Sequence, residues 1–192
     1  MTYKEIESIC KKYGIVGYSI NDDGSIDVDG DVNLVNFKLN ELPVKFNKVN
    51  GNFYCHNNQL TTLKGCPSEV SKDLWIDSNE LTSLEGCPIY VGGDFDCNDN
   101  NLTSLIGSPI EVGGSFSCIY NQLSSLVDLP TVLGYIDFVN NPLHPFYSDV
   151  HNMLGNDIKI FIKYMDHYEV FEPVFNAVNG LDLIDEIKDG LR

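Results

Sequence analysis

Apolar positions recur along this chain of 192 residues with a period of about 21. An Asn-x-Leu unit marks each period, with steps of 21, 21, 21 and 20 residues: Asn58/Leu60, Asn79/Leu81, Asn100/Leu102, Asn121/Leu123 and Asn141/Leu143. The other columns in register are Phe53, Leu74, Phe95, Phe116 and Ile136; Cys55, Ile76, Cys97, Cys118 and Phe138; Leu63, Leu84, Leu105 and Leu126; Pro67, Pro88, Pro109 and Pro130; and Val70, Val91, Val112 and Leu133. A period of this length predicts a solenoid whose coils bury their apolar faces against one another.

Each column has a predicted role in the coil. The Phe-x-Cys pair alternates with polar residues, which indicates a short strand with one buried face. The Asn follows that strand, where its side-chain amide can pair with backbone groups that a tight bend leaves in the interior. A degenerate first coil contains Val32, Leu34, Leu39, Leu42 and Val49 at the same spacing.

The segments outside the repeats follow other patterns. Residues 3–13 have the apolar spacing of a short amphipathic helix, and residues 18–28 that of a β-hairpin turning at 21–24. After Pro142 the apolar spacing becomes helical again. We therefore predict an N-terminal cap over residues 1–30, a solenoid over 31–143 and a C-terminal helical cap over 144–192.

The repeat unit F-x-C-x-x-N-x-L-x-x-L-x-G-x-P-x-x-V-G-G resembles the leucine-rich repeat, in the 21-residue variant common in proteins of tailed bacteriophages. The stretches DGSIDVDGDVNL and LPVKFNKVNGNF also resemble the N-terminal cap of that phage family. This resemblance implies an α+β leucine-rich-repeat solenoid with about five to six short parallel strands and a cap at each end. It also implies a phage-encoded protein of the bacterial host cytoplasm.

The charge is strongly acidic and unevenly distributed. The net charge is −16, and the interval between Lys72 and Lys159 contains twelve Asp and Glu residues but no Lys or Arg. Direct binding to nucleic-acid phosphates or anionic lipid is therefore disfavoured, and a basic protein partner is favoured. An acidic surface that serves only solubility is the alternative explanation.

In a leucine-rich-repeat fold the strands line the concave side, so the side chains between and beside the buried pair form the expected binding face. We expect the partner-binding residues to be Tyr54, Asp73, Trp75, Asp77, Asp94, Asp96, Asp99, Tyr120 and Asp137. Asp94 and Asp96 are expected to point to solvent, so that replacing both with lysine should weaken binding and leave the fold intact. Aromatic anchors with charged neighbours are typical of binding hot spots, and a merely hydrated sheet face is the alternative.

No residue pattern indicates catalysis, a cofactor or a metal. The Cys55, Cys97 and Cys118 column exchanges with Ile and Phe, so packing is its expected role. Cys66 and Cys87 lie one coil apart, where a disulfide is geometrically feasible, but a cytosolic chain keeps them reduced. The Asp and Asn rungs near Asp94–Asp99 lack a calcium-loop signature. Residues 142–192 contain no cysteine for a ubiquitin ligase of the kind that some bacterial leucine-rich-repeat effectors carry.

Two functions are compatible with these patterns. The first is a non-enzymatic interaction protein that binds and inhibits a basic host protein, such as a defence or nucleic-acid-handling factor, through the acidic face. The second is an assembly component that docks onto virion proteins. The sequence has no apolar run of membrane-spanning length and no signal peptide, so we expect a cytoplasmic protein.

Overall fold

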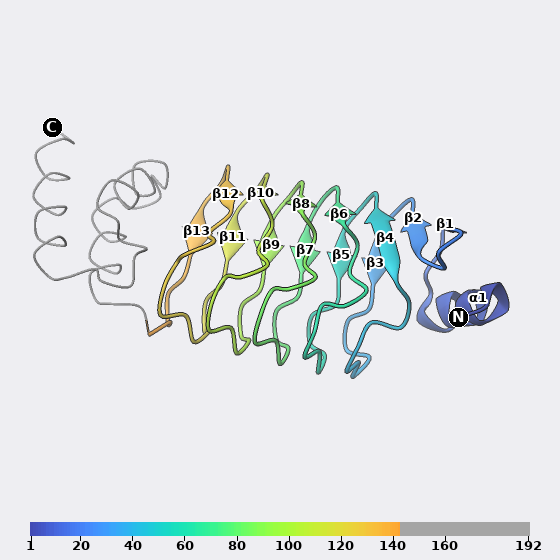
Figure 1. Cartoon of the computed structure of the whole chain (residues 1–192), viewed down its shortest axis with the longest axis horizontal. Helices are drawn as coiled ribbons and strands as arrows, with labels where there is room; N and C mark the ends of the chain where they lie inside the picture. The colour runs from blue at the N-terminus through green and yellow to red at the C-terminus, as the bar shows by residue number, and fades with distance from the viewer. Residues whose placement is uncertain (143–192) are drawn as a thin grey trace, which may run out of the picture.

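The computed structural model describes residues 1–142, which form one N-terminal helix followed by a parallel β-solenoid of about five turns. Each complete coil contributes one strand to each of two sheets, and the coils stack along a nearly straight axis (Figure 1). The repeat predicted from the 21-residue period is therefore confirmed as a solenoid. Leu143 and the predicted C-terminal cap lie outside the described residues.

The first sheet has six strands in the order β13-β11-β9-β7-β5-β3, each paired in parallel with the next coil. Its members are β3 (Val32–Asn33), β5 (Phe53–Tyr54), β7 (Leu74–Trp75), β9 (Phe95–Asp96), β11 (Phe116–Ser117) and β13 (Ile136–Asp137). These are the strands predicted from the Phe-x-Cys columns. In each of them the first residue points into the core and the second points outward.

The second sheet has seven strands in the order β1-β2-β4-β6-β8-β10-β12, of which only the β1–β2 hairpin was predicted from the sequence. Its members are β1 (Tyr18–Ile20), β2 (Ile26–Val28), β4 (Phe46–Val49), β6 (Glu69–Val70), β8 (Tyr90–Val91), β10 (Glu111–Val112) and β12 (Thr131–Val132). The valine column therefore belongs to a second set of strands.

The last member of the valine column is Val132, which corrects the assignment of Leu133 from the sequence. Val112 pairs with Val132, and Glu111 pairs with Thr131. The side chain of Val132 is 3% exposed, whereas that of Leu133 is 58% exposed. The shortened 20-residue period thus loses its residue just before β12.

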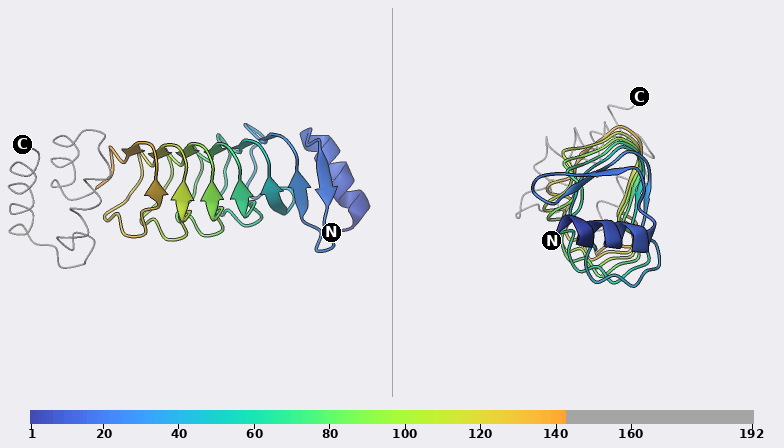
Figure 2. Two further views of the ribbon diagram at one scale, coloured as in Figure 1. Left: turned by 90° about the horizontal axis from the view of Figure 1, so that it is seen from above. Right: turned by 90° about the vertical axis from the view of Figure 1, so that its right-hand side faces the viewer.

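The core is a column of large apolar side chains. The end-on view in Figure 2 shows the coils that enclose it. Phe46 and Phe53 come from opposite sheets, and their ring centroids lie 5.0 Å apart; those of Phe95 and Phe116 lie 5.2 Å apart along the stack. Every residue of the Phe, Cys and Leu columns within residues 1–142 is buried. Because no coil covers its own apolar side chains, stacking supplies most of the hydrophobic stabilisation.

A ladder of asparagines joins successive coils, as their column predicted. In the coil of β9, the Asn100 amide nitrogen donates to carbonyls of two coils, at 3.1 Å to Ile76 and 3.2 Å to Cys97. Its side-chain oxygen accepts the N–H of Leu81 at 3.0 Å. The same pattern recurs at Asn58, Asn79, Asn121 and Asn141.

The residue before each ladder asparagine has a left-handed backbone. The column consists of Asn57, Ser78, Asp99, Tyr120 and Asn140, with φ between 50° and 61°, and Asn36 before Phe37 has the same conformation in the first coil, with φ 63°. Asn and Asp tolerate this conformation better than other non-glycine residues, so the corner selects for small polar side chains, with Tyr120 as an exception. Gly113 is required for close packing of the backbones, since a Cβ there would overlap the backbone carbonyl of Gly92 in the neighbouring coil.

The N-terminal helix α1 (Tyr3–Tyr13) and the β1–β2 hairpin have the bounds expected from the sequence. Thr2 and Glu5 form a capping box, and Gly14 ends the helix with φ 68°. Figure 2 shows α1 lying across the end of the solenoid. Strand β2 pairs in parallel with β4, so the hairpin extends the second sheet as well as covering the first coil. No helix within residues 1–142 has the length and apolarity needed to span a membrane.

Candidate protein-binding face

The candidate site is the outer side of the six-stranded sheet, called here the β3–β13 face. Its central row consists of the outward residues of the strands: Asn33, Tyr54, Trp75, Asp96, Ser117 and Asp137. Five of these were predicted to point outward. Because adjacent strands lie about 5 Å apart, Tyr54 and Asp137 are about 20 Å apart along the row. The predicted residues therefore form a strip, and only some of them are neighbours.

An aromatic cluster occupies the strip at β5 and β7. The ring centroids of Tyr54 and Trp75 are 4.9 Å apart, and those of His56 and Trp75 are 5.7 Å apart. The Trp75 side chain is 38% exposed, so part of the indole is open to solvent. His56 was not among the predicted site residues. The sequence does contain a signal for His56, because it follows Tyr54 by two residues and therefore lies on the same side of the strand.

Asp73 and Asp94 form a second ladder, parallel to the central row. Asp73 Oδ1 accepts the N–H of Asp94 at 2.9 Å, and Asp94 Oδ1 accepts the N–H of Ser115 at 2.7 Å. In the preceding coil, Asn52 Oδ1 accepts the N–H of Asp73 at 3.1 Å. Asp94 is exposed, as expected, but its carboxylate also has a structural role that the sequence did not indicate. The backbone N–H groups also offset the repulsion expected between neighbouring carboxylates.

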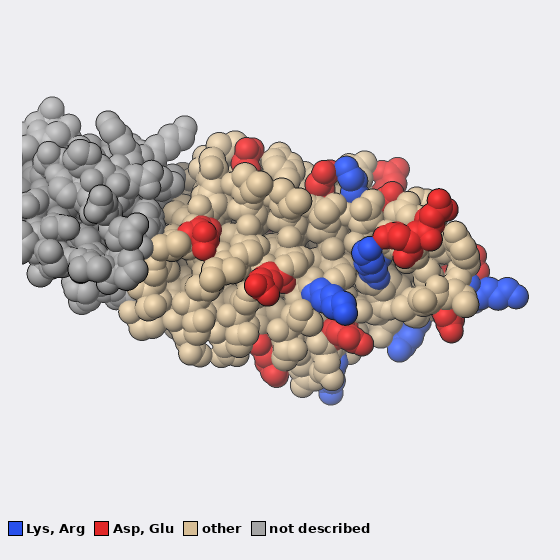
Figure 3. All heavy atoms as spheres, viewed as in Figure 1, with Lys and Arg blue, Asp and Glu red and all other residues tan. Residues whose placement is uncertain are grey.

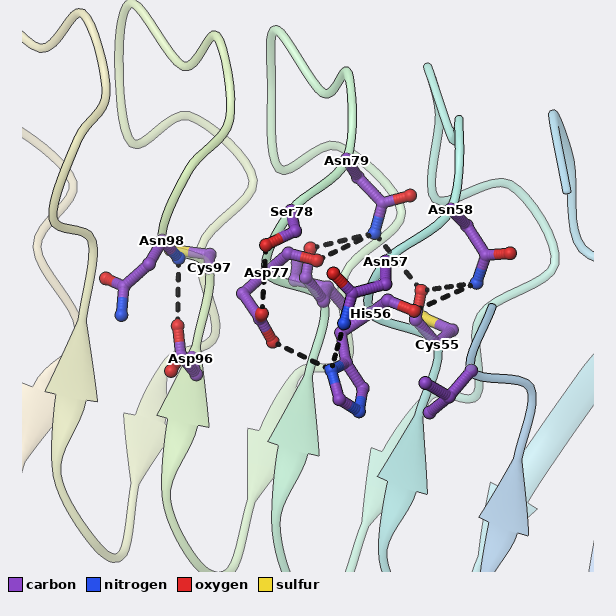
Figure 4. Close-up of polar contacts among 12 residues, drawn as sticks. Cys55, His56, Asn57, Asn58, Asp77, Ser78, Asn79, Asp96, Cys97 and Asn98 are labelled. Carbon is purple, nitrogen blue, oxygen red and sulfur yellow. Dashed lines mark hydrogen bonds and ion pairs between the residues drawn. The ribbon is translucent and has the colours of Figure 1, made fainter. Parts of the chain in front are cut away.

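Asp96 is likewise more constrained than expected. Its side chain is half-buried, and its Oδ1 accepts the N–H of Asn98 at 2.9 Å (Figure 4). Burial raises the pKa of the Asp96 carboxyl, the Asn98 N–H opposes that shift, and the charges of Asp77 and Asp99 add to it. Asp96 is thus an acid held in a place where its negative charge is disfavoured.

Asp77 lies beside the aromatic cluster. Its Oδ1 is 3.6 Å from His56 Nδ1, and its Oδ2 accepts the hydroxyl of Ser78 at 3.2 Å (Figure 4). Asn57 Nδ2 also lies 3.2 Å from His56 Nδ1, so this nitrogen accepts from Asn57 in the neutral ring or pairs with Asp77 when it carries a proton. These contacts orient the imidazole beside Trp75.

The remaining predicted residues lie away from this centre. Asp99 and Tyr120 occupy the left-handed corner column, and the Tyr120 side chain is 59% exposed. Asp137 lies in β13, three strands from Trp75, and its Oδ1 accepts the N–H of Val139 at 3.1 Å. The structure therefore gathers Tyr54, Asp73, Trp75, Asp77 and Asp96 around one point and leaves the others along the strip.

The carboxylates of the face have no lysine or arginine partner among residues 1–142. The ion pairs in this part of the chain are Lys45–Asp23, Lys48–Glu69 and, for a protonated ring, His56–Asp77. Lysine side chains lie over the half of the solenoid next to α1, whereas carboxylates continue toward β13 (Figure 3). The face therefore has an unneutralised negative potential.

The buried thiols pack in the interior and take no part in the face. All six cysteines are free, including Cys66 and Cys87, and Cys55, Cys97 and Cys118 are fully buried. Burial raises the pKa of the Cys66 thiol to about 12. No group of three or more His, Cys, Asp or Glu side chains within residues 1–142 is placed to hold a metal ion.

Comparison with known proteins gives no match. No protein-family model, no curated protein and no solved structure matches the chain.

Proposed function

We propose that this protein is a non-enzymatic binding module whose β3–β13 face binds a positively charged protein. The observation that carries the proposal is the set of carboxylates on this face without a lysine or arginine partner in the described residues. Exposed aromatic rings among them supply apolar contact area. Carboxylates of this kind steer a basic partner and fix its register, while aromatic side chains supply most of the binding free energy.

Inhibition of a basic host protein is the narrower form of the proposal. It is supported by the resemblance of the repeat to leucine-rich repeats of tailed phages, which is also the basis for proposing a phage origin and action in the bacterial cytoplasm. A basic surface that binds nucleic acid is complementary to an acidic strip. Once covered by this face, such a surface is closed to nucleic acid.

Asparagine occupies equivalent positions in other coils of this chain, which indicates variants that remove the charge and keep the hydrogen bond. Asn52 accepts the N–H of Asp73 as Asp73 accepts that of Asp94. Asn33 Oδ1 accepts the N–H of Val35 as Asp96 accepts that of Asn98. Asp→Asn at these positions therefore keeps the backbone acceptor and removes the charge.

The test compares two triple variants with the same change in net charge. The face variant is Asp73→Asn/Asp94→Asn/Asp96→Asn, and the control variant, on the turns and the second sheet, is Glu85→Gln/Glu111→Gln/Asp128→Asn. Each protein is immobilised and incubated with bacterial extract, and bound proteins are quantified by mass spectrometry. We expect a basic protein that the wild type and the control variant capture equally and the face variant captures about tenfold less, with capture falling as salt rises.

An identical set of captured proteins for all three baits would refute the assignment of this face. Circular dichroism of each bait checks that a lost protein reflects lost charge and an intact fold. For inhibition, the captured protein is tested for nucleic-acid binding with and without the solenoid. Simultaneous binding of both would remove the inhibitory part of the proposal and leave the binding part.

A further inference from the structure

Trp75 occupies a place on the β3–β13 face that no other residue of the face shares. Along its own chain it lies between Asp73 and Asp77, and across the sheet it pairs with Tyr54 on one side and Asp96 on the other. Residues two apart on a strand share a face, and cross-strand partners lie about 5 Å apart. Trp75 therefore has an acidic residue at three neighbouring positions of the face and Tyr54 at a fourth.

The rings make a rigid support for a flat ligand group. Tyr54 meets Trp75 at an interplanar angle of 53°, and His56 meets it nearly edge-on at 83°. These contacts restrict the indole and leave 38% of the Trp75 side chain exposed. The face of an indole ring attracts cations within about 6 Å of its centroid.

The neighbouring carboxylates have no lysine or arginine as countercharge in the described residues. Asp73, Asp77 and Asp96 have no lysine or arginine within ion-pair distance among residues 1–142. The side chain of Asp77 is 21% exposed, so that carboxylate is partly desolvated while still open to a ligand. A cation placed over the indole would reduce the repulsion that the Asp77 charge exerts on Asp96, which helps to raise the pKa of the Asp96 carboxyl.

We propose that Trp75, supported by Tyr54 and His56 and flanked by Asp73, Asp77 and Asp96, binds an arginine side chain of the partner protein. The inference rests on the proposed function and names the chemical group that the face recognises. A guanidinium is planar, so it stacks on the indole while its N–H donors point outward in its own plane. Asp73, Asp77 and Asp96 occupy neighbouring positions on the same face, so carboxylate acceptors for those donors are close at hand. A lysine ammonium gains the charge attraction but cannot stack.

Trp75 is the only tryptophan of the chain, so its fluorescence reports directly on this site. The probe is a capped pentapeptide with one arginine between glycines, compared with matched peptides that carry lysine or citrulline. Citrulline has nearly the shape of arginine but no charge. We expect saturable change of the emission with the arginine peptide, binding at least about fivefold weaker with lysine, and no saturation with citrulline.

Variants place the peptide at the carboxylates. Asp77→Asn/Asp96→Asn is expected to weaken arginine-peptide binding by about tenfold or more, whereas the control Glu85→Gln/Glu111→Gln stays within about twofold of the wild type. Equal binding of the three peptides overturns the proposal. Wild-type affinity in the Asp77→Asn/Asp96→Asn variant overturns it as well.

A Trp75→Leu bait in the capture experiment separates this inference from the proposed function. If that bait keeps a partner that the Asp73→Asn/Asp94→Asn/Asp96→Asn bait loses, the face binds a basic protein but the arginine site is wrong. If the arginine peptide binds at Trp75 while no captured protein depends on the face, the site stands and the proposed function is wrong.

Discussion

Replacing Asn100 with alanine tests the asparagine ladder at a buried position in the middle of the solenoid. The side chain is 7% exposed, and it donates to the carbonyls of Ile76, Cys97 and Asn98 while accepting the N–H of Leu81. Each of those three carbonyls keeps another donor in the variant, namely Asn79 Nδ2, Asn121 Nδ2 and the Ser78 N–H respectively. The Leu81 N–H has no second acceptor among residues 1–142. The main loss is therefore one buried N–H group.

An unpaired buried N–H costs about 1–3 kcal/mol, and the weakened carbonyl bonds with the small void add to it, so Asn100→Ala should lower the free energy of unfolding by about 2–4 kcal/mol. The neighbouring Asn101→Ala is the control, because Asn101 is exposed and its side chain accepts only from Gln122, at 3.3 Å. Its expected effect is below about 0.5 kcal/mol. Urea unfolding followed by circular dichroism, with equal m-values, measures both. If the two variants are equally stable, the ladder does not hold the coils together as argued.

The thiols and Asp96 give two further predictions. Burial raises the pKa of the Cys66 thiol to about 12, and the thiolate is the form that reacts with iodoacetamide. At about pH 8 we therefore expect Cys66 to stay unmodified in the native protein, whereas all six cysteines are modified after denaturation. Rapid labelling of native Cys66, measured by mass spectrometry, would contradict this. Burial raises the folded-state pKa of Asp96 above its ordinary 3.8, so the folded state binds this proton more tightly, and stability is lost as pH rises through that raised pKa. Asp96→Asn should therefore be more stable than the wild type at pH 7 and lose that advantage as pH falls below about 4 in thermal unfolding, and a pH-independent difference would assign the effect to packing.

The repeat columns made much of the fold predictable, because buried apolar and outward polar residues alternate along each strand of the first sheet and this alternation is visible in the sequence. Phe95 and Cys97 flank Asp96, so the strand, its buried face and its outward residue all followed from three positions. The second sheet could not be read in the same way. Each of its later strands offers a single buried residue, such as Val70 after the exposed Glu69, and one residue shows no alternation.

The placement of Leu133 failed for a related reason. With one residue missing from the last period, anchoring on Pro130 leaves two assignments for the next apolar position, and only the pairing of Thr131 with Glu111 decides between them. The hydrogen bond of Asp94 could not be predicted either. An outward carboxylate has the same sequence pattern whether it faces water or a backbone N–H of the next coil.

The repeats also show which part of the face is free to serve a partner. The column that contains Asp73 and Asp94 consists of Asp31, Asn52, Asp73, Asp94 and Ser115. Each of these side chains accepts a backbone N–H from the next coil, so the column is limited to short side chains with an oxygen. In the central row, Asn33, Asp96 and Asp137 each accept an N–H within their own coil, but the row also admits side chains without such an acceptor. It changes from Tyr54 and Trp75 to Asp96 and Ser117 within four coils. Packing cannot explain that variation, because these side chains lie outside the core. A row that admits both aromatic and acidic side chains, and that places its aromatic rings beside half-buried acids, is where recognition of a partner is best sought.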